Sequence, residues 1–443
     1  MKTDILIIGS GCAGLYMAMN LPRDKKITII TKKDVESSDS YLAQGGMCVL
    51  KNAADYDSFF EDTMKAGHYE NDKTSVDIMI RSSREVLEDL LSYGADFHRN
   101  EDGSLDYTRE GGHSDKRIVY HKDITGKEIT RNILKEVQKL SNVQILEYTT
   151  MLDIISKDNK CYGAVVKNAD DSITTIQAQV TVLACGGIGG LYRHSTNFRH
   201  LTGDALAVAI KHNVKLKDVD YIQIHPTTLY SEREEDRSFL ISESVRGEGA
   251  HLLDKNMNRF VNELLPRDLL TAAIREQMEK DGTEFVWEDL RPIPKDELLA
   301  HFPNIVEHCK EMGYDVTKEC IPVVPAQHYF MGGIDVNHQS KTSMDNLYAI
   351  GETACNGVHG KNRLASNSLL ESLVFAKRAA VDMLKWIADA RYIDNDKKSI
   401  ASLTVEEVDL NQYKDTAKLE KEYKDMVLDV IEDFRRKRTE MDV

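Results

Sequence analysis

Histidine, arginine and carboxylate side chains gather between residues 218 and 325 in a pattern that suits the capture of a small dianion. Most of them occur in three short motifs, HPTT at 225–228, SESVRGE at 242–248 and PRD at 266–268. Arginine holds a carboxylate through parallel hydrogen bonds, and histidine adds a directional donor. With two residues from the flanking segments, the candidate trap for a dicarboxylate comprises Arg246, Arg267, Arg363, His225 and His328.

Part of this set could also move protons. Glu243 and Arg246 lie three positions apart, so a helix would place them on one face. Beside Arg267 they form a row in which each guanidinium has a partner able to return its proton. Each residue also has a simpler interpretation: His225 as a turn residue, His328 as a buried structural residue, Glu243 with Arg246 as a surface ion pair, and Arg267 as part of a helix cap. The occurrence of the whole set favours a functional site.

Two glycine-containing turns predict a dinucleotide site. The first follows an apolar run at 5–8, has glycines at positions 9, 11 and 14, and precedes a helical pattern at 15–21 and a second strand at 27–31. This GxGxxG spacing allows a tight turn, backbone approach to a pyrophosphate and close helix packing. The second turn, 351–371, separates a strand at 347–350 from a helix that begins near Ser368. Both turns could contact one large dinucleotide; the alternative is an unrelated βαβ unit.

The acid that usually binds the ribose at the end of the second strand is absent. Thr31, Lys32 and Lys33 occupy this region instead. Because that acid holds the ribose of NAD in ordinary dehydrogenases, its absence makes an NAD dehydrogenase less favoured.

Bulk composition narrows the possible partners. The chain has 443 residues, of which 41% are hydrophobic and 29% charged, and its net charge is −16. This balance predicts two or three globular domains and argues against nucleic acid as a partner. No apolar run approaches the roughly 18 residues of a membrane span. The seven cysteines are scattered without a CxxC pair, which predicts a cytoplasmic protein without a metal centre.

Hydrophobic periodicity predicts an α/β fold. Helices are expected at 55–66, 75–93, 130–139, 267–280 and 418–438, and short strands at 143–146, 152–156, 163–167 and 173–177. A continuous apolar run at 180–184 is expected to be a separate buried strand that returns to the parallel sheet. The predicted domains are a Rossmann-like domain formed by 1–217 and 326–390, an inserted α+β domain at 218–325, and a short C-terminal helical segment at 391–443.

These motifs resemble those of the flavoproteins of the succinate dehydrogenase/fumarate reductase superfamily, and within it the L-aspartate oxidases of NAD biosynthesis. The resemblance covers about residues 3–385. It rests on the segments GSGCAG, SYLAQGG, REGGHS, TGD, HPTTLY, SESVRGEGAHL, PRD, PAQHYFMGGI and GETACNGVHGKNRLASNSLLES.

The resemblance implies FAD in the Rossmann-like domain and a capping domain at 218–325. The implied cofactor-binding residues are Gly9, Ser10, Gly11, Cys12, Ala13, Gly14, Lys32, Asp39, Ser40, Tyr41, Leu42, Ala43, Gln44, Gly45, Gly46, Asp204, Glu352, Ser368 and Leu369. The implied substrate-binding residues are Glu110, His225, Ser242, His328 and Arg363. Arg267 is implied as the acid/base residue, supplied with protons through Glu243 and Arg246.

Two positions distinguish members of the superfamily. The covalent-flavin enzymes have a histidine five residues before the glutamine of AQGG, and here that position is Asp39, so FAD is expected to be non-covalent. Where those enzymes have an uncharged residue, this chain has Glu110, which suits an ammonium group. Both positions favour the oxidation of L-aspartate over that of succinate.

The resemblance therefore implies oxidation of L-aspartate to iminoaspartate by hydride transfer to FAD, with oxygen or fumarate as electron acceptor. This reaction is the first step of NAD (quinolinate) biosynthesis, which makes quinolinate synthase a candidate partner of a monomer or homodimer. Two alternatives remain open: a soluble fumarate reductase or succinate dehydrogenase flavoprotein, and a flavin-binding subunit that only transfers electrons or acts as a scaffold.

Overall fold

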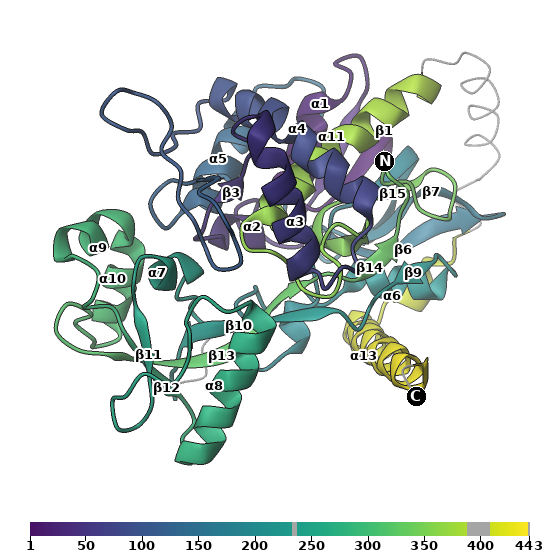
Figure 1. Ribbon diagram of the computed structural model, residues 1–443. Coiled ribbons are helices and arrows are strands. Elements are labelled where there is room, and N and C mark those ends of the chain that lie inside the picture. Colours follow the sequence, from purple (N-terminus) through teal and green to yellow (C-terminus); the bar gives the residue numbers. More distant parts are fainter. Residues whose placement is uncertain (233–236, 388–407, 442–443) are drawn as a thin grey trace.

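Two β-sheets organise the chain, a large one in the part that holds both termini and a smaller one in a lobe beside it (Figure 1). The computed structural model describes residues 1–232, 237–387 and 408–441. The predicted junction between 390 and 391 lies outside these residues. The α/β fold with a Rossmann-like domain, an added α+β unit and a C-terminal helix is confirmed.

The large sheet has seven strands in the described residues, with the order β5-β2-β1-β8-β7-β6 and β15 beside β8. Its strands are β1 (Lys2–Ile8), β2 (Ile27–Ile30), β5 (Val143–Leu146), β6 (Thr150–Lys157), β7 (Lys160–Lys167), β8 (Ile173–Leu183) and β15 (Leu347–Ala349). β5, β2, β1, β8 and β15 are parallel, and β6 and β7 add an antiparallel edge. The parallel strands are continuously apolar because helices cover both faces of the sheet.

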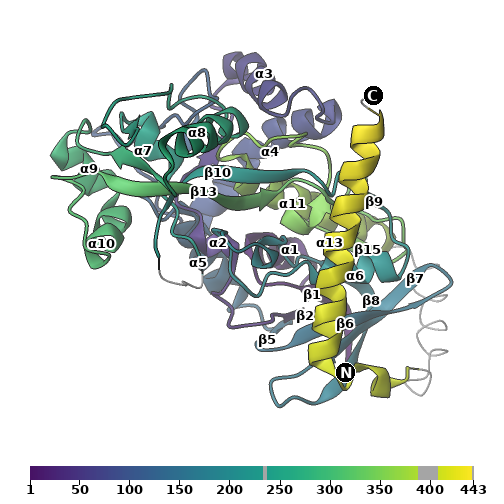
Figure 2. The ribbon, with the colours of Figure 1, turned by 90° about the horizontal axis from the view of Figure 1, so that it is seen from below.

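Alternate residues of β1 show the two faces directly. Ile5 and Ile7 belong to one hydrophobic core, whereas Leu6 and Ile8 belong to the other, as the two-residue period of a strand requires. The first face is covered by α1 (Cys12–Asn20), α3 (Tyr56–Ala66), α4 (Lys73–Ser92), α5 (Thr125–Val137) and α11 (Asn367–Ile387). The second face is covered by α6 (Asp204–Lys211) and α13 (Thr416–Met441), which runs along α6 in Figure 2.

One strand prediction was wrong. The expected separate strands at 173–177 and 180–184 form the single strand β8, which continues through Ala178. Its first half pairs with antiparallel β7, where Gln177 lies opposite Gly163. Its second half pairs with parallel β1, where Val180 lies opposite Ile5. The apolar pattern changes along the strand because its neighbours change, and this change resembled a break.

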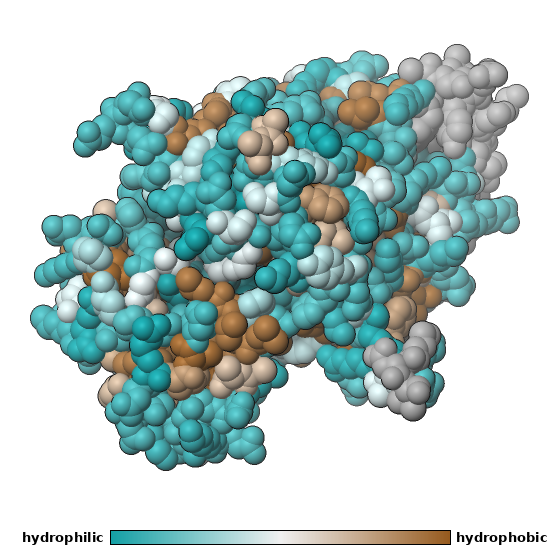
Figure 3. Space-filling view, in the orientation of Figure 1, coloured by the Kyte–Doolittle hydropathy of each residue, from teal (hydrophilic) through white to brown (hydrophobic). Residues whose placement is uncertain are grey.

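The smaller lobe contains a four-stranded sheet with the order β10-β13-β12-β11. Its elements are β10 (Ile222–Leu229), α7 (Glu243–Gly247), β11 (His251–Leu253), α8 (Arg267–Asp281), β12 (Val286–Asp289), α9 (Lys295–His301), α10 (Pro303–Glu311) and β13 (Ile321–Phe330). The lobe has a hydrophobic core of its own. The visible face of the molecule is mostly hydrophilic, with apolar residues gathered over this lobe (Figure 3). We call the lobe the cap; its limits at 218 and 325 stay a prediction, and β13 crosses the second of them.

Short elements complete the described structure: α2 (Asp39–Leu42), β3 (Met47–Cys48), η1 (Ala53–Asp55), β4 (Ile118–Val119), η2 (Gly189–Leu191), β9 (Leu216–Lys217), β14 (Gly333–Asp335), η3 (Gly351–Thr353), β16 (Ala354–Cys355) and η5 (Leu410–Tyr413). The C-terminal helix α13 is held by ion pairs to the loop that precedes β10. Its Arg438 Nε lies 2.7 Å from Asp220 Oδ2, and its Nη2 lies 3.0 Å from Asp218 Oδ1.

Within 1–232, 237–387 and 408–441, no helix combines the length and hydropathy needed to cross a membrane. The same residues contain no group of three or more histidine, cysteine, aspartate or glutamate side chains arranged to hold a metal ion.

Candidate active site

A single cavity connects the two glycine-rich turns with the predicted dicarboxylate trap. Its space amounts to about 1660 Å³, part of it open to solvent. The lining includes Gly9 and Gly11 from the first turn, Glu352 from the second, and His225 and Arg267 from the cap. The residues at its two ends suit a dinucleotide together with a small second ligand.

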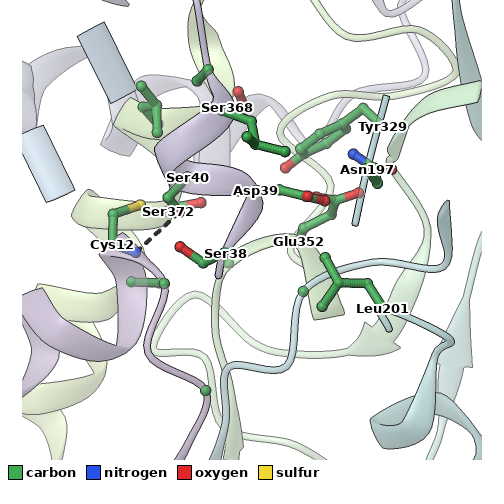
Figure 4. Close-up of a pocket in the computed structure, with 18 of the residues that line it drawn as sticks. Cys12, Ser38, Asp39, Ser40, Asn197, Leu201, Tyr329, Glu352, Ser368 and Ser372 are labelled. Carbon is green, nitrogen blue, oxygen red and sulfur yellow. Dashed lines mark hydrogen bonds between the residues drawn. The ribbon is translucent and has the colours of Figure 1, made fainter. Parts of the chain in front are cut away.

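The N-terminus of α1 forms one end of the cavity. Gly9 adopts φ 122°, a left-handed conformation that glycine adopts readily. Gly11 precedes the helix, and a Cβ at this position would come within 3.2 Å of Ser40 Oγ. The backbone N–H of Cys12 donates to Ser40 Oγ at 3.0 Å (Figure 4). Free backbone donors at such a terminus suit a pyrophosphate.

Lys32 occupies the place where the ribose-binding acid was missing. Its Nζ lies 2.8 Å from Asp204 Oδ2. Thr202 Oγ1 donates to the other oxygen of Asp204 at 2.7 Å. A carboxylate is therefore present at this end of the cavity, but it comes from the start of α6 instead of from the end of β2.

Two buried carboxyl groups, Asp39 and Glu352, face each other inside the cavity (Figure 4). Asp39 Oδ1 accepts from the backbone N–H of Phe198 at 3.0 Å, and Glu352 Oε1 accepts from that of Phe330 at 2.9 Å. Burial raises the pKa of Asp39 to about 7; burial and the nearby Asp39 raise the pKa of Glu352 to about 8. Asp39 Oδ2 has no partner among the described residues. Such groups can accept hydrogen bonds from the hydroxyls of a ribityl chain, so the cavity fits FAD.

Most residues predicted to bind the cofactor line this cavity: Gly9, Ser10, Gly11, Cys12, Ala13, Lys32, Asp39, Ser40, Leu42, Ala43, Gln44, Gly45, Gly46, Asp204, Glu352, Ser368 and Leu369. Gly14 and Tyr41 do not belong to the lining. Gly14 lies against the backbone of the turn that follows β1, where a Cβ would come within 2.2 Å of Gly9 O. It therefore serves the close packing of α1 on the sheet.

The cap end of the cavity collects four of the five predicted trap residues, His225, Arg267, His328 and Arg363, but not Arg246. Antiparallel pairing of β10 with β13 brings the rings of His225 and His328 to a centroid distance of 5.0 Å. Burial and Arg267 keep the pKa of both histidines well below the usual range, so both rings are neutral donors or acceptors. His225 Nε2 and Arg363 Nε are buried and without a hydrogen-bond partner among the described residues. These two atoms are available to a bound carboxylate, whereas the Ser242 hydroxyl donates to Ser244 Oγ at 3.2 Å.

Arg267 and Glu243 form a buried ion pair in the cavity wall. Arg267 Nε lies 2.6 Å from Glu243 Oε2, and Arg267 Nη1 donates to Gln223 Oε1 at 2.8 Å. Burial opposes ionisation of Glu243, but Arg267 and then Arg246 outweigh it and lower the pKa of Glu243. The pair is therefore ionised and holds the guanidinium of Arg267 at the lining.

Arg246 lies behind this pair and does not line the cavity. It donates to Thr227 Oγ1, and its Nε donates to the carbonyl of Glu263 at 3.3 Å. Of the three predicted relay members, Arg267 and Glu243 touch directly, while Arg246 acts on Glu243 through its charge.

Glu110 faces the same cavity from the loop before β4. Its side chain is 4% exposed. Ser244 Oγ donates to its Oε1 at 2.6 Å, and Ser366 Oγ donates to its Oε2 at 2.5 Å. Burial and the neighbouring Glu243 raise the pKa of Glu110. Both oxygens of Glu110 therefore accept from hydroxyls of other segments and not from the backbone of the adjacent turn at Gly111.

Three residues of the site were missed in the sequence. Ser244 and Ser366 hold Glu110, and Gln223 holds Arg267 while its Nε2 donates to the backbone carbonyl of Arg363 at 2.8 Å. Gln223 stands two positions before His225 on the same strand. That two-residue spacing places it on the same face and was the available signal.

Comparison with known proteins agrees with this cavity. The FAD binding domain family matches residues 4–369. An L-aspartate oxidase of Clostridium perfringens is 50% identical over 395 residues, which are 89% of this chain and 90% of that protein. The L-aspartate oxidase of Clostridium acetobutylicum is 50% identical over 86% of this chain and 87% of its own length. The chain belongs to the L-aspartate oxidase family. It is an FAD-dependent oxidoreductase.

Solved structures place this family beside the fumarate reductases. A point mutant of the E. coli quinol fumarate reductase subunit FrdA is similar with a TM-score of 0.83 and 29% identity, and the match covers 90% of this chain and 74% of that one. Mycobacterium smegmatis Sdh1 in complex with UQ1 has a TM-score of 0.74 and 28% identity over 91% of this chain and 72% of that one. Fold similarity alone therefore does not separate an amino-acid oxidase from a fumarate reductase.

Acid precipitation of the yellow protein is expected to leave the flavin in the supernatant. The reason is that Asp39, whose carboxyl group faces the cavity, cannot form the histidyl–flavin bond of the covalent enzymes. Absorbance of pellet and supernatant measures the partition, and free FAD mixed with denatured protein is the control. Yellow colour that stays in the washed pellet would contradict a non-covalent cofactor.

Proposed function

We propose that the cavity oxidises L-aspartate to iminoaspartate, with Arg267 as the acid/base residue and Glu110 as the residue that recognises the amino group. The reaction removes a hydride from the α-carbon and a proton from the nitrogen of L-aspartate. FAD, when bound, supplies the two-electron acceptor for that hydride. The observation that carries the proposal is one cavity that holds both a cofactor end and a trap with a buried carboxylate.

The roles of the trap residues follow from their unused hydrogen-bonding atoms. His225 Nε2 and Arg363 Nε have no partner among the described residues although they are buried, which costs free energy unless a ligand pairs with them. A dicarboxylate bound by these atoms and by His328 would satisfy them. The residues would then fix the α-carbon in one place, which is the main contribution that binding can make to hydride transfer.

Arg267 is the proposed proton-transfer group because it reaches the lining while bonded to an ionised partner. Glu243 is ionised 2.6 Å from its Nε, so it can take up the proton that Arg267 passes on from the substrate nitrogen. Arg246 keeps Glu243 ionised from behind. In the reverse direction, the reduction of fumarate, the same group would deliver the proton that accompanies the hydride.

Glu110 is proposed to separate L-aspartate from succinate. Both substrates carry two carboxylates, so His225, His328 and Arg363 bind them alike. A carboxylate beside the α-carbon favours an ammonium group through a charge-assisted hydrogen bond. The same charge repels a substrate that lacks the amino group.

Three contacts join the cap to the large part beside the cavity. Ser244 of the cap bonds to Glu110 of the large part, and His68 Nε2 lies 2.9 Å from Asp268 Oδ2 at the start of α8. Asp123 accepts from the backbone N–H of Ile305 at the start of α10 at 2.7 Å. These contacts support a cap that excludes water from the reacting atoms.

We propose oxygen or fumarate as the electron acceptor, the cytoplasm as the location, and a monomer or homodimer as the assembled form. Formation of iminoaspartate is proposed as the first step of quinolinate biosynthesis, in which quinolinate synthase would use the product.

A substrate panel tests this function. The FAD-loaded chain is expected to oxidise L-aspartate with an artificial electron acceptor and release oxaloacetate and ammonia after hydrolysis of the imine, with little oxidation of succinate. Faster oxidation of succinate would favour the fumarate reductase or succinate dehydrogenase alternative. Absence of turnover with either substrate would favour a module that only transfers electrons.

A further inference from the structure

Both oxygens of the Glu110 carboxylate are bonded to serine hydroxyls from different parts of the chain. Ser244 lies in α7 of the cap, and Ser366 lies just before α11 of the large part. Both serines are at least nine-tenths buried, so their hydroxyls bond to protein groups and are largely shielded from bulk water. We propose that Ser244 and Ser366 are specificity-determining residues that hold Glu110 ready for the substrate's amino group, an inference that rests on the proposed function of Glu110.

The surroundings of Ser366 fix the direction of its hydrogen bond. The backbone N–H of Gly46 donates to Ser366 Oγ at 3.1 Å, which leaves the hydroxyl proton for Glu110. Ser366 has φ 61°, a left-handed conformation that is costly for serine. The backbone N–H of Cys48 donates to its carbonyl at 3.0 Å and holds this conformation. Ser366 thus connects Glu110 to the predicted flavin loop at Gly46.

Ser244 is oriented in a similar way from the cap. Ser242 Oγ donates to Ser244 Oγ at 3.2 Å, and Ser244 Oγ donates to Glu110 Oε1 at 2.6 Å. A hydroxyl that accepts one hydrogen bond donates the next one more strongly. Ser242 is also a predicted substrate residue, so the row of hydroxyls leads from the trap to Glu110. Because this bond joins the cap to the large part, a movement of the cap away from the cavity would break it.

The hydroxyls matter because the carboxylate is otherwise in an unfavourable place for a charge. Burial and the charge of Glu243 raise the pKa of Glu110, while the bonds from Ser244 and Ser366 oppose that shift. Among the described residues, no other titratable side chain is seen to bond to Glu110. Arg267 from the cap and Arg363 from the large part act on it by charge, and the buried thiol of Cys48 lies within range of its charge. A Glu110 that took up a proton would no longer prefer an ammonium group over a hydrogen atom. The two serines therefore preserve the charge on which the discrimination depends.

The test compares two reactions in the FAD-loaded full chain. Ser244→Ala is expected to lower kcat/KM for L-aspartate about tenfold or more, the size of one hydrogen bond to a charged group, and to lower fumarate reduction much less. Loss of the Ser244 donor should raise the pKa of Glu110 further. The rise of L-aspartate oxidation with pH should therefore shift to higher pH. Ser244→Thr keeps the hydroxyl and should restore most of the activity. Ser104→Ala, which removes a 2.6 Å bond to Asp102 on an exposed turn, is the matched control.

A double substitution separates this inference from the function on which it rests. In the Glu110→Gln background, Ser244→Ala should cause no further selective loss. Equal losses for both reactions, with an unmoved pH profile and no rescue by threonine, would make Ser244 merely structural and overturn the inference while Glu110→Gln stays selective. If Glu110→Gln itself lowers both reactions equally, the proposed role of Glu110 fails and the inference fails with it. Ser366→Ala should act in the same direction as Ser244→Ala, with the flavin content measured by absorbance because the contact with Gly46 is also lost.

Discussion

Replacement of Arg267 by lysine is expected to leave FAD bound and to lower fumarate reduction by about 10²–10⁴-fold, the usual contribution of a positioned proton donor. Reduction of fumarate needs a proton as well as a hydride, and Arg267 is a guanidinium of the lining that is bonded to an ionised carboxylate. Lysine keeps the charge but cannot bond to Glu243 and Gln223 at once, because it lacks the planar fork that makes both contacts.

The matched control for this substitution is Arg275→Lys, an exposed arginine two turns further along α8. Rates of fumarate reduction and the flavin content of both variants are compared with those of the unchanged protein. A selective loss in kcat with FAD retained supports a proton-transfer role. Unchanged turnover with fumarate would show that the proton arrives by another route.

Glu110→Gln is expected to lower kcat/KM for L-aspartate roughly tenfold to a hundredfold. Glutamine has nearly the same shape, so the substitution removes the charge, and a charge-assisted hydrogen bond contributes about 1.5–3 kcal/mol. Fumarate carries no ammonium group, so its reduction should fall much less. Glu101→Gln, on an exposed part of the same long loop, is the matched control.

The pH dependence provides a second measurement on the same variant. The pKa of Glu110 lies above the usual value for glutamate because of burial and Glu243. The ionised form binds the ammonium group, so oxidation of L-aspartate by the unchanged protein should fall as the pH drops through this raised pKa. The glutamine variant should lack that decline. If both reactions fall together and the pH profile is unchanged, Glu110 is structural and the discrimination lies elsewhere.

Local chemistry made much of the nucleotide-binding part predictable. The strand–glycine–helix order around Gly9 depends on a few neighbouring residues, and continuous apolar runs marked the buried parallel strands. β8 was divided wrongly because its two halves have different neighbours, which a single sequence does not reveal. The cap helix at 267–280 and the C-terminal helix at 418–438 were recognisable from their periodicity and were off by no more than a few residues at their ends.

Contacts between distant segments limited the prediction of the site. Ser244 and Glu110 are separated by 134 positions, and Ser366 and Glu110 by 256. Nothing near a serine in the sequence shows which carboxylate it will meet. Likewise, the strand that ends at Lys32 does not supply the carboxylate at this end of the cavity. That carboxylate belongs to Asp204, 172 positions away. The trap residues were found because histidine and arginine gather unusually in one segment. The serines that orient Glu110 are common residues and gave no such signal.

Anaerobic mixing of the FAD-loaded protein with L-aspartate tests the central claim most directly. Flavin absorbance near its visible maximum is followed without any electron acceptor, and succinate is mixed in a parallel experiment. We expect rapid bleaching with L-aspartate, because the hydride from its α-carbon reduces the cofactor, and slow or no bleaching with succinate. Bleaching by succinate with an unchanged spectrum in L-aspartate would contradict the account.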